Sequence, residues 1–327
     1  MLVLTRAETA ALLEPDALRE AVASAMAEVS AGRASMPPRI GAMVPERGGL
    51  LAAMPAYLPG LPGLAAKLVT VFPENAGPAL DTHQAVIAVF DPSDGRPVAL
   101  MDGTSVTAAR TAAGSALSTD LLARPDARVL AILGTGVQAR SHAIAVTRVR
   151  SFSEVRVAGR DGAKAAALAA DLSGLDVPVV PAASFEEACA GADVVCATTH
   201  SPDPVVRRAW LSAGAHVTSV GYNTAGREVD SETVADALVV VETREAVLAP
   251  PPSGAGDIRI PIEEGVIGAD HIHAEIGELV AGTARGRSSP DEITLYKSVG
   301  VAAQDVAAAV LVLEAARAAG AGVEVMM

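Results

Sequence analysis

The sequence predicts an α/β protein in which a doubly wound parallel sheet is joined to a second domain of different texture. Three observations carry this prediction. An apolar strand runs into a glycine turn at residue 134, short strands and helices alternate after it, and that alternation is missing before residue 128. The length of 327 residues also exceeds one comfortable hydrophobic core and favours two domains.

The alternating region predicts strands and helices in chain order. Short apolar runs are typical of buried parallel strands, and the segments between them have helical spacing. Because helices join such strands, their carboxyl ends meet at one edge of the sheet, where ligands bind. The expected strands are residues 129–133, 155–158, 177–180, 194–198, 216–220 and 238–241, with one helix ending at Arg148 and others at 163–172 and 185–190.

The segments on either side predict the other domain. Residues 16–30 have an amphipathic helical pattern, and the strand-like segments 66–71 and 85–90 suit antiparallel pairing. After Gly300 the run VAAQDVAAAVLVLEAARAA predicts a long helix that could return to this first domain. The Pro/Gly-dense run 250–256 is expected to be a surface loop.

Composition excludes several classes of function. A formal charge of −13 without clustered Lys and Arg argues against a nucleic-acid partner. The chain has no apolar run of about 18 residues and no export signal at its start, so we expect a cytoplasmic protein with no membrane partner. Cys189 and Cys196 are expected to be buried small residues. The histidines, including His271 and His273, lack the spacing of metal ligands, so we expect no metal.

The glycine turn has the pattern of a dinucleotide-binding site. Gly134 permits the tight turn, Gly136 leaves room for a pyrophosphate, and Ala139 lets the following helix pack closely on the strand. The amides at the start of that helix then face the anion. The alternative is an ordinary glycine turn of an α/β protein.

The end of the next strand bears on the choice of dinucleotide. An acid about 20 residues after the glycines normally binds the ribose 2′-hydroxyl of NAD. Here Arg160 would suit the 2′-phosphate of NADP, whereas Asp161 could still serve the hydroxyl. We expect NAD(P) with a weak preference for NADP, the alternative being that both are solvated loop residues.

The first domain contains three basic residues in apolar surroundings, Arg39, Lys67 and Arg110. A substrate carboxylate needs such cations, since arginine binds it through two parallel hydrogen bonds and lysine adds a mobile charge. Any one alone could be a surface cation, but Arg110 lies in a helix that looks buried and demands an anionic partner. His83 could touch cofactor or substrate, or be a structural histidine.

Several motifs in fixed order resemble the ornithine cyclodeaminase/mu-crystallin family nearly end to end. They are PPR at 37–39, MPAYL at 54–58, Lys67 with FPEN at 72–75, HQA at 83–85, MDGTSVTAARTAAGSA from Met101, GTGVQA at 134–139, SVG at 219–221, REVD at 227–230, GDI at 256–258 and ITLYKSVGVAAQD at 293–305.

The resemblance implies a homodimer and a Rossmann domain inserted into a split α+β substrate domain. We expect residues 1–114 and 301–327 to form the substrate-binding and dimerisation domain and 115–300 the NAD(P)-binding domain. The resemblance further implies that Arg39, Lys67 and Arg110 hold the carboxylate of a small amino or imino acid. Residues along the cofactor would be Thr82, His83, Arg110, Thr111, Gly134, Thr135, Gly136, Val137, Gln138, Arg160, Asp161, Thr198, Val220, Gly221 and Ser298.

The family divides by chemistry into imine reductases, alanine dehydrogenases and cyclodeaminases. This chain departs from the cyclodeaminase pattern, because Asn223 replaces the family's catalytic aspartate and the acid expected just before Met54 is missing from residues 49–53. An amide can hydrogen-bond but cannot act as a base. We therefore expect an NAD(P)H-dependent cyclic ketimine reductase or an alanine dehydrogenase-like enzyme. The alternatives are an ornithine cyclodeaminase and a cofactor-bound protein without turnover, as in mu-crystallin's lens role.

Overall fold

The computed structural model describes residues 1–75, 80–223 and 226–326 and divides into two compact units. Unit 1 comprises Met1–Arg110 and Val301–Met327, and unit 2 comprises Thr111–Gly300. The first boundary lies within helix α3 (Gly103–Leu122), a few residues before the expected position. The second boundary coincides with the expected one at Gly300.

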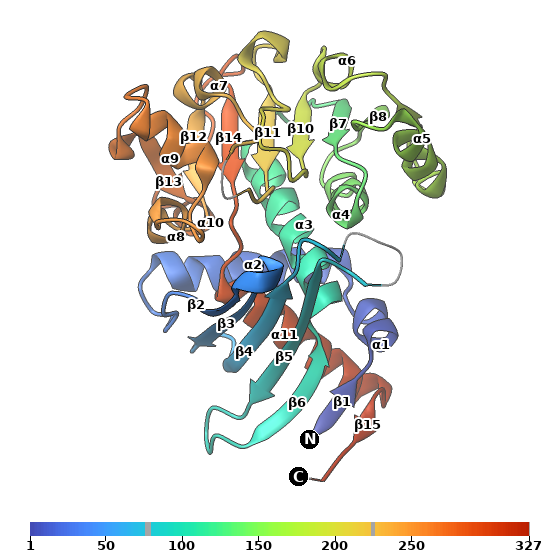
Figure 1. Cartoon of the computed structure of the whole chain (residues 1–327), viewed down its shortest axis with the longest axis vertical. Coiled ribbons are helices and arrows are strands. Elements are labelled where there is room, and N and C mark those ends of the chain that lie inside the picture. The colour runs from blue at the N-terminus through green and yellow to red at the C-terminus, as the bar shows by residue number, and fades with distance from the viewer. Residues whose placement is uncertain (76–79, 224–225, 327) are drawn as a thin grey trace. The chain divides into compact units, whose positions relative to one another are not determined.

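Unit 2 is built on an all-parallel sheet of eight strands (Figure 1). The strand order is β13-β12-β14-β11-β10-β7-β8-β9, so the direction of winding reverses between β7 and β10. This confirms the expected doubly wound sheet. The strands are β7 (Val129–Leu133), β8 (Glu154–Ala158), β9 (Val179–Pro181), β10 (Val194–Ala197), β11 (His216–Ser219), β12 (Leu238–Val241), β13 (Ile272–Glu275) and β14 (Thr294–Lys297).

The helices of unit 2 connect these strands in the way the alternating pattern predicts. They are α4 (Val137–Val146), α5 (Gly162–Asp171), α6 (Phe185–Cys189), α7 (Ser231–Asp236), α8 (Arg244–Leu248), α9 (Gly256–Glu263) and α10 (Ile276–Val280). The expected strand 238–241 is confirmed as β12 of this sheet. Strand β14 lies between β12 and β11, and neither β13 nor β14 was predicted from the sequence.

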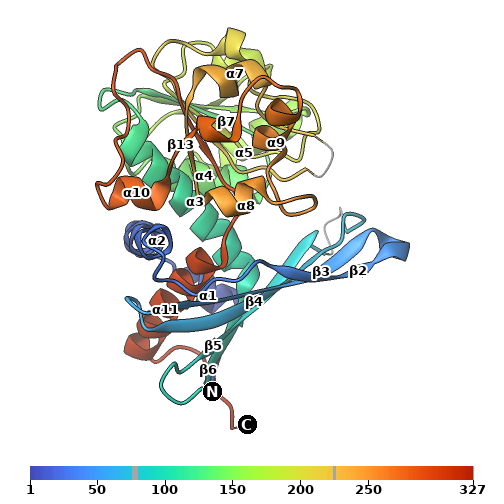
Figure 2. The same ribbon diagram turned by 90° about the vertical axis from the view of Figure 1, so that its left-hand side faces the viewer.

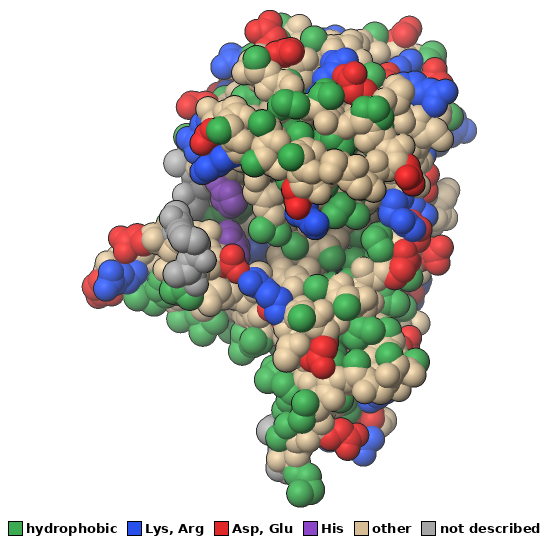
Figure 3. All heavy atoms as spheres, turned by 90° about the vertical axis from the view of Figure 1, so that its right-hand side faces the viewer, with side chains coloured by type: hydrophobic (Ala, Val, Ile, Leu, Met, Phe, Trp, Pro, Cys, Tyr) green, Lys and Arg blue, Asp and Glu red, His purple; other side chains and the backbone are tan. Residues whose placement is uncertain are grey.

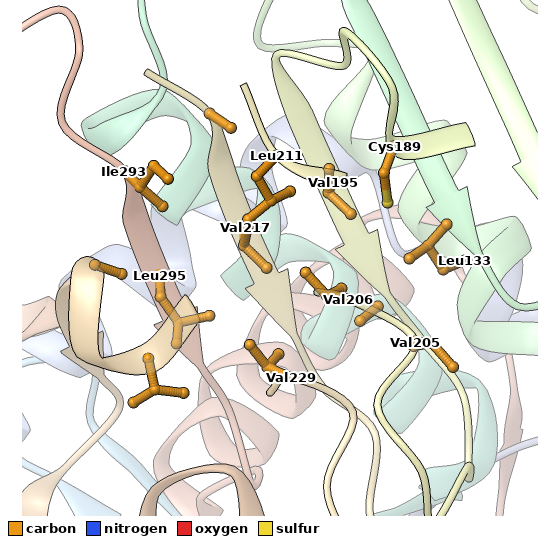
Figure 4. Close-up of a cluster of buried hydrophobic side chains, with 14 of the residues drawn as sticks. Leu133, Cys189, Val195, Val205, Val206, Leu211, Val217, Val229, Ile293 and Leu295 are labelled. Carbon is orange, nitrogen blue, oxygen red and sulfur yellow. The ribbon is translucent and has the colours of Figure 1, made fainter. Parts of the chain in front are cut away.

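Both faces of this sheet are buried, because alternate residues of its strands belong to two separate apolar clusters. Along β10, Val195 lies in one cluster and Val194 and Cys196 in the other. Figure 4 shows the first cluster, with Leu133, Val195, Val217 and Leu295 gathered from neighbouring strands. Cys189 and Cys196 are buried free thiols, as expected.

Unit 1 contains a seven-stranded sheet of order β15-β1-β6-β5-β4-β3-β2. Its expected antiparallel pairing of β4 with β5 is confirmed, and the pairing of β1 with β6 is parallel. Helix α11 (Ala302–Ala319) returns to this unit as expected and packs on β3, β4, β5 and α2 (Figure 2). The remaining elements are β1 (Leu2–Leu4), α1 (Arg6–Ala11), α2 (Pro15–Ser30), β2 (Ile40–Val44), β3 (Gly49–Leu58), β4 (Gly63–Val71), β5 (His83–Phe90), β6 (Pro97–Asp102) and β15 (Val323–Glu324).

The two faces of the unit 1 sheet differ in burial. Lys67 and the alternate residues of β4 lie on the buried face, against α11. On the opposite face the strand registers align Ile40, Ala53, Leu68 and Val86 in one row across four strands. Ile40 is 71% exposed, Leu68 42% and Val86 44%. Figure 3 shows hydrophobic side chains gathered along the arm formed by β2 and β3. We call the row of Ile40, Ala53, Leu68 and Val86 the apolar sheet face.

Candidate active site

The glycine turn after β7 has the geometry that a close backbone turn requires. Gly134 has φ +128°, a conformation that L side chains rarely adopt, and its amide donates to the carbonyl of Ala158 at 2.8 Å. A Cβ atom at Gly134 would lie 2.6 Å from Oγ1 of Thr198. Thr198 cannot withdraw easily, because its Oγ1 donates to the carbonyl of Leu133 at 2.8 Å.

The start of helix α4 offers space and backbone donors for an anion. A Cβ atom at Gly136 would meet nothing within 4 Å among the described residues, and no described side chain caps the helix there. The first amides of a helix have no partner within the helix and carry the positive end of its dipole. Thr135, Val137 and Gln138 flank this N-terminus, where Val137 is 63% exposed.

Arg160 and Asp161 follow β8 and differ in what they contact. Oδ1 of Asp161 accepts hydrogen bonds from the amides of Ala163 at 3.0 Å and Lys164 at 3.3 Å. Asp161 is therefore the N-cap of α5, and this oxygen is occupied by the helix. Arg160 is exposed at the carboxyl end of β8.

The other residues expected along the cofactor in unit 2 follow strands of the same sheet. Val220 and Gly221 come directly after β11, and the amide of Val220 donates to the carbonyl of Ala197 at 3.1 Å. Ser298 follows β14, and its hydroxyl donates to Glu242 at 2.8 Å. These residues and the glycine turn therefore share the carboxyl edge of the sheet, where ligands of such sheets bind.

Asn223 lies in a loop of unit 2. Its Nδ2 donates to the carbonyl of His200 at 3.0 Å. It also lines a cavity of about 250 Å³ together with Pro252, Gly254 and Arg259. Its amide is thus partly engaged by the backbone, and it provides no carboxylate at this position.

Two of the three expected cations meet in the interior of unit 1. Nζ of Lys67 lies 2.8 Å from Oδ2 of Asp305, and Nε of Arg110 lies 2.9 Å from Oδ1 of the same carboxylate. Gln304 completes the cluster by accepting a hydrogen bond from Nη1 of Arg110 at 3.1 Å. Asp305 is the anionic partner that the sequence of Arg110 demanded. Two cations thus share one carboxylate, which leaves a net positive charge in a buried place.

This environment changes the acidity of Lys67. Burial lowers the pKa of its ammonium to about 8, against the attraction of Asp305. The charges of Arg110 and Arg39 add to the lowering, so Arg39 acts on the same group of cations. With a pKa of about 8, Lys67 is largely protonated at neutral pH and loses its proton as the pH rises through about 8.

Three further expected residues lie elsewhere. Thr82 and His83 stand at the start of β5 in unit 1, where the carbonyl of Thr82 accepts from the amide of Phe72 at 2.9 Å. Thr111 is buried in α3 at the beginning of unit 2. Among the residues that the structure describes, no three His, Cys, Asp or Glu side chains could hold a metal ion. No described helix is long and apolar enough to cross a bilayer.

A sequence model of the ornithine cyclodeaminase/mu-crystallin family matches residues 1–320. The chain belongs to this family. It is 39% identical to the ketimine reductase mu-crystallin of Mus musculus over 284 residues, which are 86% of either chain. The likeness extends through both units and confirms the resemblance carried by the motifs.

Solved structures of similar proteins agree with this assignment. The Δ1-pyrroline-2-carboxylate reductase of Thermococcus litoralis, in complex with NADH and L-proline, matches with a TM-score of 0.95 and 39% identity, over 99% of this chain and 100% of that one. An archaeal alanine dehydrogenase dimer with bound NAD matches with a TM-score of 0.92 and 33% identity, over 100% and 99% of the two chains.

Several buried charged or polar residues of the two units were not predicted as site residues from the sequence. Asp305 and Gln304 interrupt an otherwise apolar helix, and a carboxylate in such a helix was the available signal. Glu228, Asp257 and Lys297 lie in motifs of the family, but nothing in their spacing shows that they touch. Their contact depends on which strand ends are neighbours.

The two glycines of the turn provide a matched pair of variants. Gly136→Ala should keep the thermal stability of the wild type, because its Cβ would enter open space at φ −96°, which alanine adopts without strain. It should weaken NADH or NADPH binding by about tenfold or more if a pyrophosphate occupies that space. Gly134→Ala should lower both stability and affinity. Fluorescence titration and thermal melts measure the two effects, and unchanged affinity in Gly136→Ala would contradict the assignment.

Proposed function

We propose that this protein is an NAD(P)H-dependent oxidoreductase that acts on the C–N bond of a small amino or imino acid, with cyclic ketimines such as pyrroline-2-carboxylate as its main substrates. The observation that carries this proposal is the buried cluster of Lys67, Arg110 and Asp305, where cations exceed carboxylates. A substrate carboxylate would neutralise the remaining charge. The names of the similar reductases and the dinucleotide-type turn support the same reading.

The proposed roles follow from the contacts of each residue. Arg39 and Arg110 hold the substrate carboxylate, and Lys67 adds charge and keeps a proton at Nζ beside the reacting C–N group. A bound reduced nicotinamide would supply the hydride that converts the protonated imine to the amine. Asp305 fixes Lys67 and Arg110 in position and favours the protonated form of Lys67. Positioning of the reactants would supply most of the rate.

Ornithine cyclodeamination remains an alternative, but the residues disfavour it. That reaction needs acids near the α-amine and the distal ammonium. Asn223 supplies an amide instead, engaged with His200. Gly49, Leu50, Leu51, Ala52 and Ala53 precede Met54 in β3 without a charge. A binding protein without turnover is disfavoured because burying Lys67 and Arg110 beside each other costs stability that binding of a dinucleotide alone would not require.

For the cofactor we propose a weak preference for NADP(H). Asp161 caps α5, which occupies one of its oxygens and disfavours a bidentate hold on the ribose hydroxyls. Arg160 is exposed at the strand end where a 2′-phosphate would lie. The similar structures that contain NADH or NAD show that relatives use the unphosphorylated cofactor.

We further propose a homodimer in which the apolar sheet face is covered by a second copy of the chain. Ile40, Ala53, Leu68 and Val86 form an apolar row across four strands, and Ile40, Leu68 and Val86 are exposed in it, which monomeric proteins rarely leave open. Strand β2 also ends the sheet without charged residues that would block pairing. The dimer of the similar alanine dehydrogenase supports this proposal.

The proposed reaction can be measured with the purified protein. Purified protein should oxidise NADPH, and NADH less efficiently, with pyrroline-2-carboxylate or piperideine-2-carboxylate, and any activity with pyruvate and ammonia should be weaker. Nicotinamide absorbance measures the rate, and Arg160→Ser should reduce the advantage of NADPH. No oxidation with any of these substrates, together with ammonia release from ornithine, would favour the cyclodeaminase instead.

The cluster of Lys67, Arg110 and Asp305 should make the reaction dependent on pH. If protonated Lys67 is required, kcat/KM should fall as the pH rises through about 8. Asp305→Asn should move this limb to lower pH, because the charge of Asp305 raises the pKa of Lys67 and its loss lowers that pKa. Lys67→Met should lower kcat by about 100-fold or more. Asp171→Asn, which breaks an exposed ion pair with Arg140, serves as the control. An unmoved limb in Asp305→Asn would remove Lys67 from the scheme.

The proposed homodimer should be detectable in solution. Light scattering should give a molar mass near twice 32.9 kDa. Leu68→Glu should shift the mass toward the monomer, because it buries a charge in the proposed interface. Val180→Glu, at an exposed apolar position of unit 2, should not. A wild-type mass of one chain would contradict the dimer.

A further inference from the structure

Three buried charged residues and one serine form a connected network at the carboxyl edge of the unit 2 sheet. They are Glu228, Asp257, Lys297 and Ser219, each nine-tenths or more buried. Nζ of Lys297 lies 2.8 Å from Oδ2 of Asp257 and donates to Oγ of Ser219 at 3.0 Å. Oγ of Ser219 donates in turn to Oε2 of Glu228 at 3.0 Å. We call this set the carboxylate network.

Glu228 joins the ends of two neighbouring strands. Its Oε1 accepts from the amide and the hydroxyl of Thr199, at 2.5 and 2.7 Å, shortly after β10 ends. Its Oε2 accepts from the amide of Gly221 at 2.6 Å, just after β11. With Ser219, four donors meet one carboxylate. Burial and the nearby charge of Asp257 raise the pKa of Glu228, whereas Lys297 and the hydrogen bonds from Thr199 lower it. The four donors are the contacts that an ionised carboxylate accepts.

Gly221 is held from both sides. Its amide donates to Glu228, and its carbonyl accepts from Nζ of Lys297 at 2.9 Å. A Cβ atom there would lie 2.1 Å from Cδ of Glu228 and 2.2 Å from the carbonyl oxygen of Thr199. The network therefore fixes the backbone of Gly221, while Asp257 accepts from the amides of Glu228 and Val229, at 2.8 and 2.9 Å, and fixes the network.

The strand order indicates which part of a dinucleotide would lie at this place. A pyrophosphate at the β7–α4 turn occupies the point where the winding reverses, and the adenosine ribose extends toward the end of β8. The other half of the molecule then extends across β10 and β11. Thr199 and Gly221 follow these two strands.

We propose that Glu228 is a positioning residue that, with Lys297 and Asp257, fixes Thr199 and Gly221 for the nicotinamide half of the cofactor. This inference rests on the proposed function. Stability alone does not explain the network, because a protein is often as stable, or more stable, when apolar side chains of similar volume replace a buried ion pair. Glu242 makes similar contacts after β14. Its buried carboxylate accepts from the amides of Val299 and Gly300, at 2.9 and 2.8 Å.

Glu228→Gln tests the proposal with almost no change in shape. A glutamine has one acceptor oxygen and one NH₂ group, so it can satisfy the amide of Thr199 or that of Gly221, but its NH₂ must then face the other amide. One backbone donor is left unpaired, and the strand end that carries it must move. Titration with the preferred reduced cofactor and with the matching ADP-ribose, which lacks nicotinamide, separates the two halves of the site.

We expect Glu228→Gln to weaken NADH or NADPH binding by about tenfold while ADP-ribose binding stays within about twofold. Asp193→Asn is the matched control. Asp193 directly precedes β10, and its carboxylate accepts from the amides of Arg128 and Val129 at the start of β7. It therefore also joins two strands of this sheet, but at the amino edge. It should leave the ratio of the two affinities unchanged. Ser219→Ala, a milder change in the same network, gives a second test if Glu228→Gln does not fold, and should shift the ratio in the same direction.

Each other outcome has a definite meaning. Equal weakening of both ligands in Glu228→Gln would show a general structural role and overturn the inference. Unchanged affinities in both network variants would overturn it as well. The proposed function itself would be overturned if the wild-type protein bound neither NADH nor NADPH. The ratio of the affinities for reduced cofactor and ADP-ribose tests only the role of Glu228.

Discussion

One carboxylate shared by two buried cations is the interaction on which the candidate substrate site depends. Lys67 comes from β4, Arg110 from α3 and Asp305 from α11. The lysine and the arginine repel each other, and in a buried place neither could stay charged without a counterion. Asp305 removes that repulsion and still leaves one positive charge in excess. In the function proposed above, an anionic substrate group would complete the neutralisation, and the packing of α11 on the sheet would then contribute to substrate binding.

Buried carboxylates also gather several hydrogen-bond donors in unit 2, where most of the donors are backbone amides. There the buried carboxylates of Glu228 and Glu242 collect backbone amides from the loops that follow β10, β11 and β14. Backbone amides at strand ends have no partner within the sheet, and a carboxylate can accept several of them at once. Glu228 thereby ties together the loops that follow β10 and β11. A rigid set of loop ends is what hydride transfer requires of its cofactor site.

Local patterns predicted much of the fold because they depend on neighbours in the chain. The period of apolar residues located most strands of the parallel sheet, and the glycines located its first turn. The helix after Gly300 was expected in unit 1, where α11 lies. The short strands β13 and β14 were not predicted from the sequence, because four residues of mixed polarity have no distinctive period. The insertion of β14 between β11 and β12 had no signal in the order of the chain.

What the sequence by itself determined is the fold class, the family and the residue types of the candidate site. These rest on periodicity, on glycine positions and on motifs that persist along the chain. Only the tertiary structure decided which charges meet. Lys67 and Asp305 are far apart in sequence, as are Gly221 and Lys297, and each pair forms because different strands and helices bring the two residues together. A contact between distant residues depends on topology, and topology is a property of the whole chain rather than of any segment.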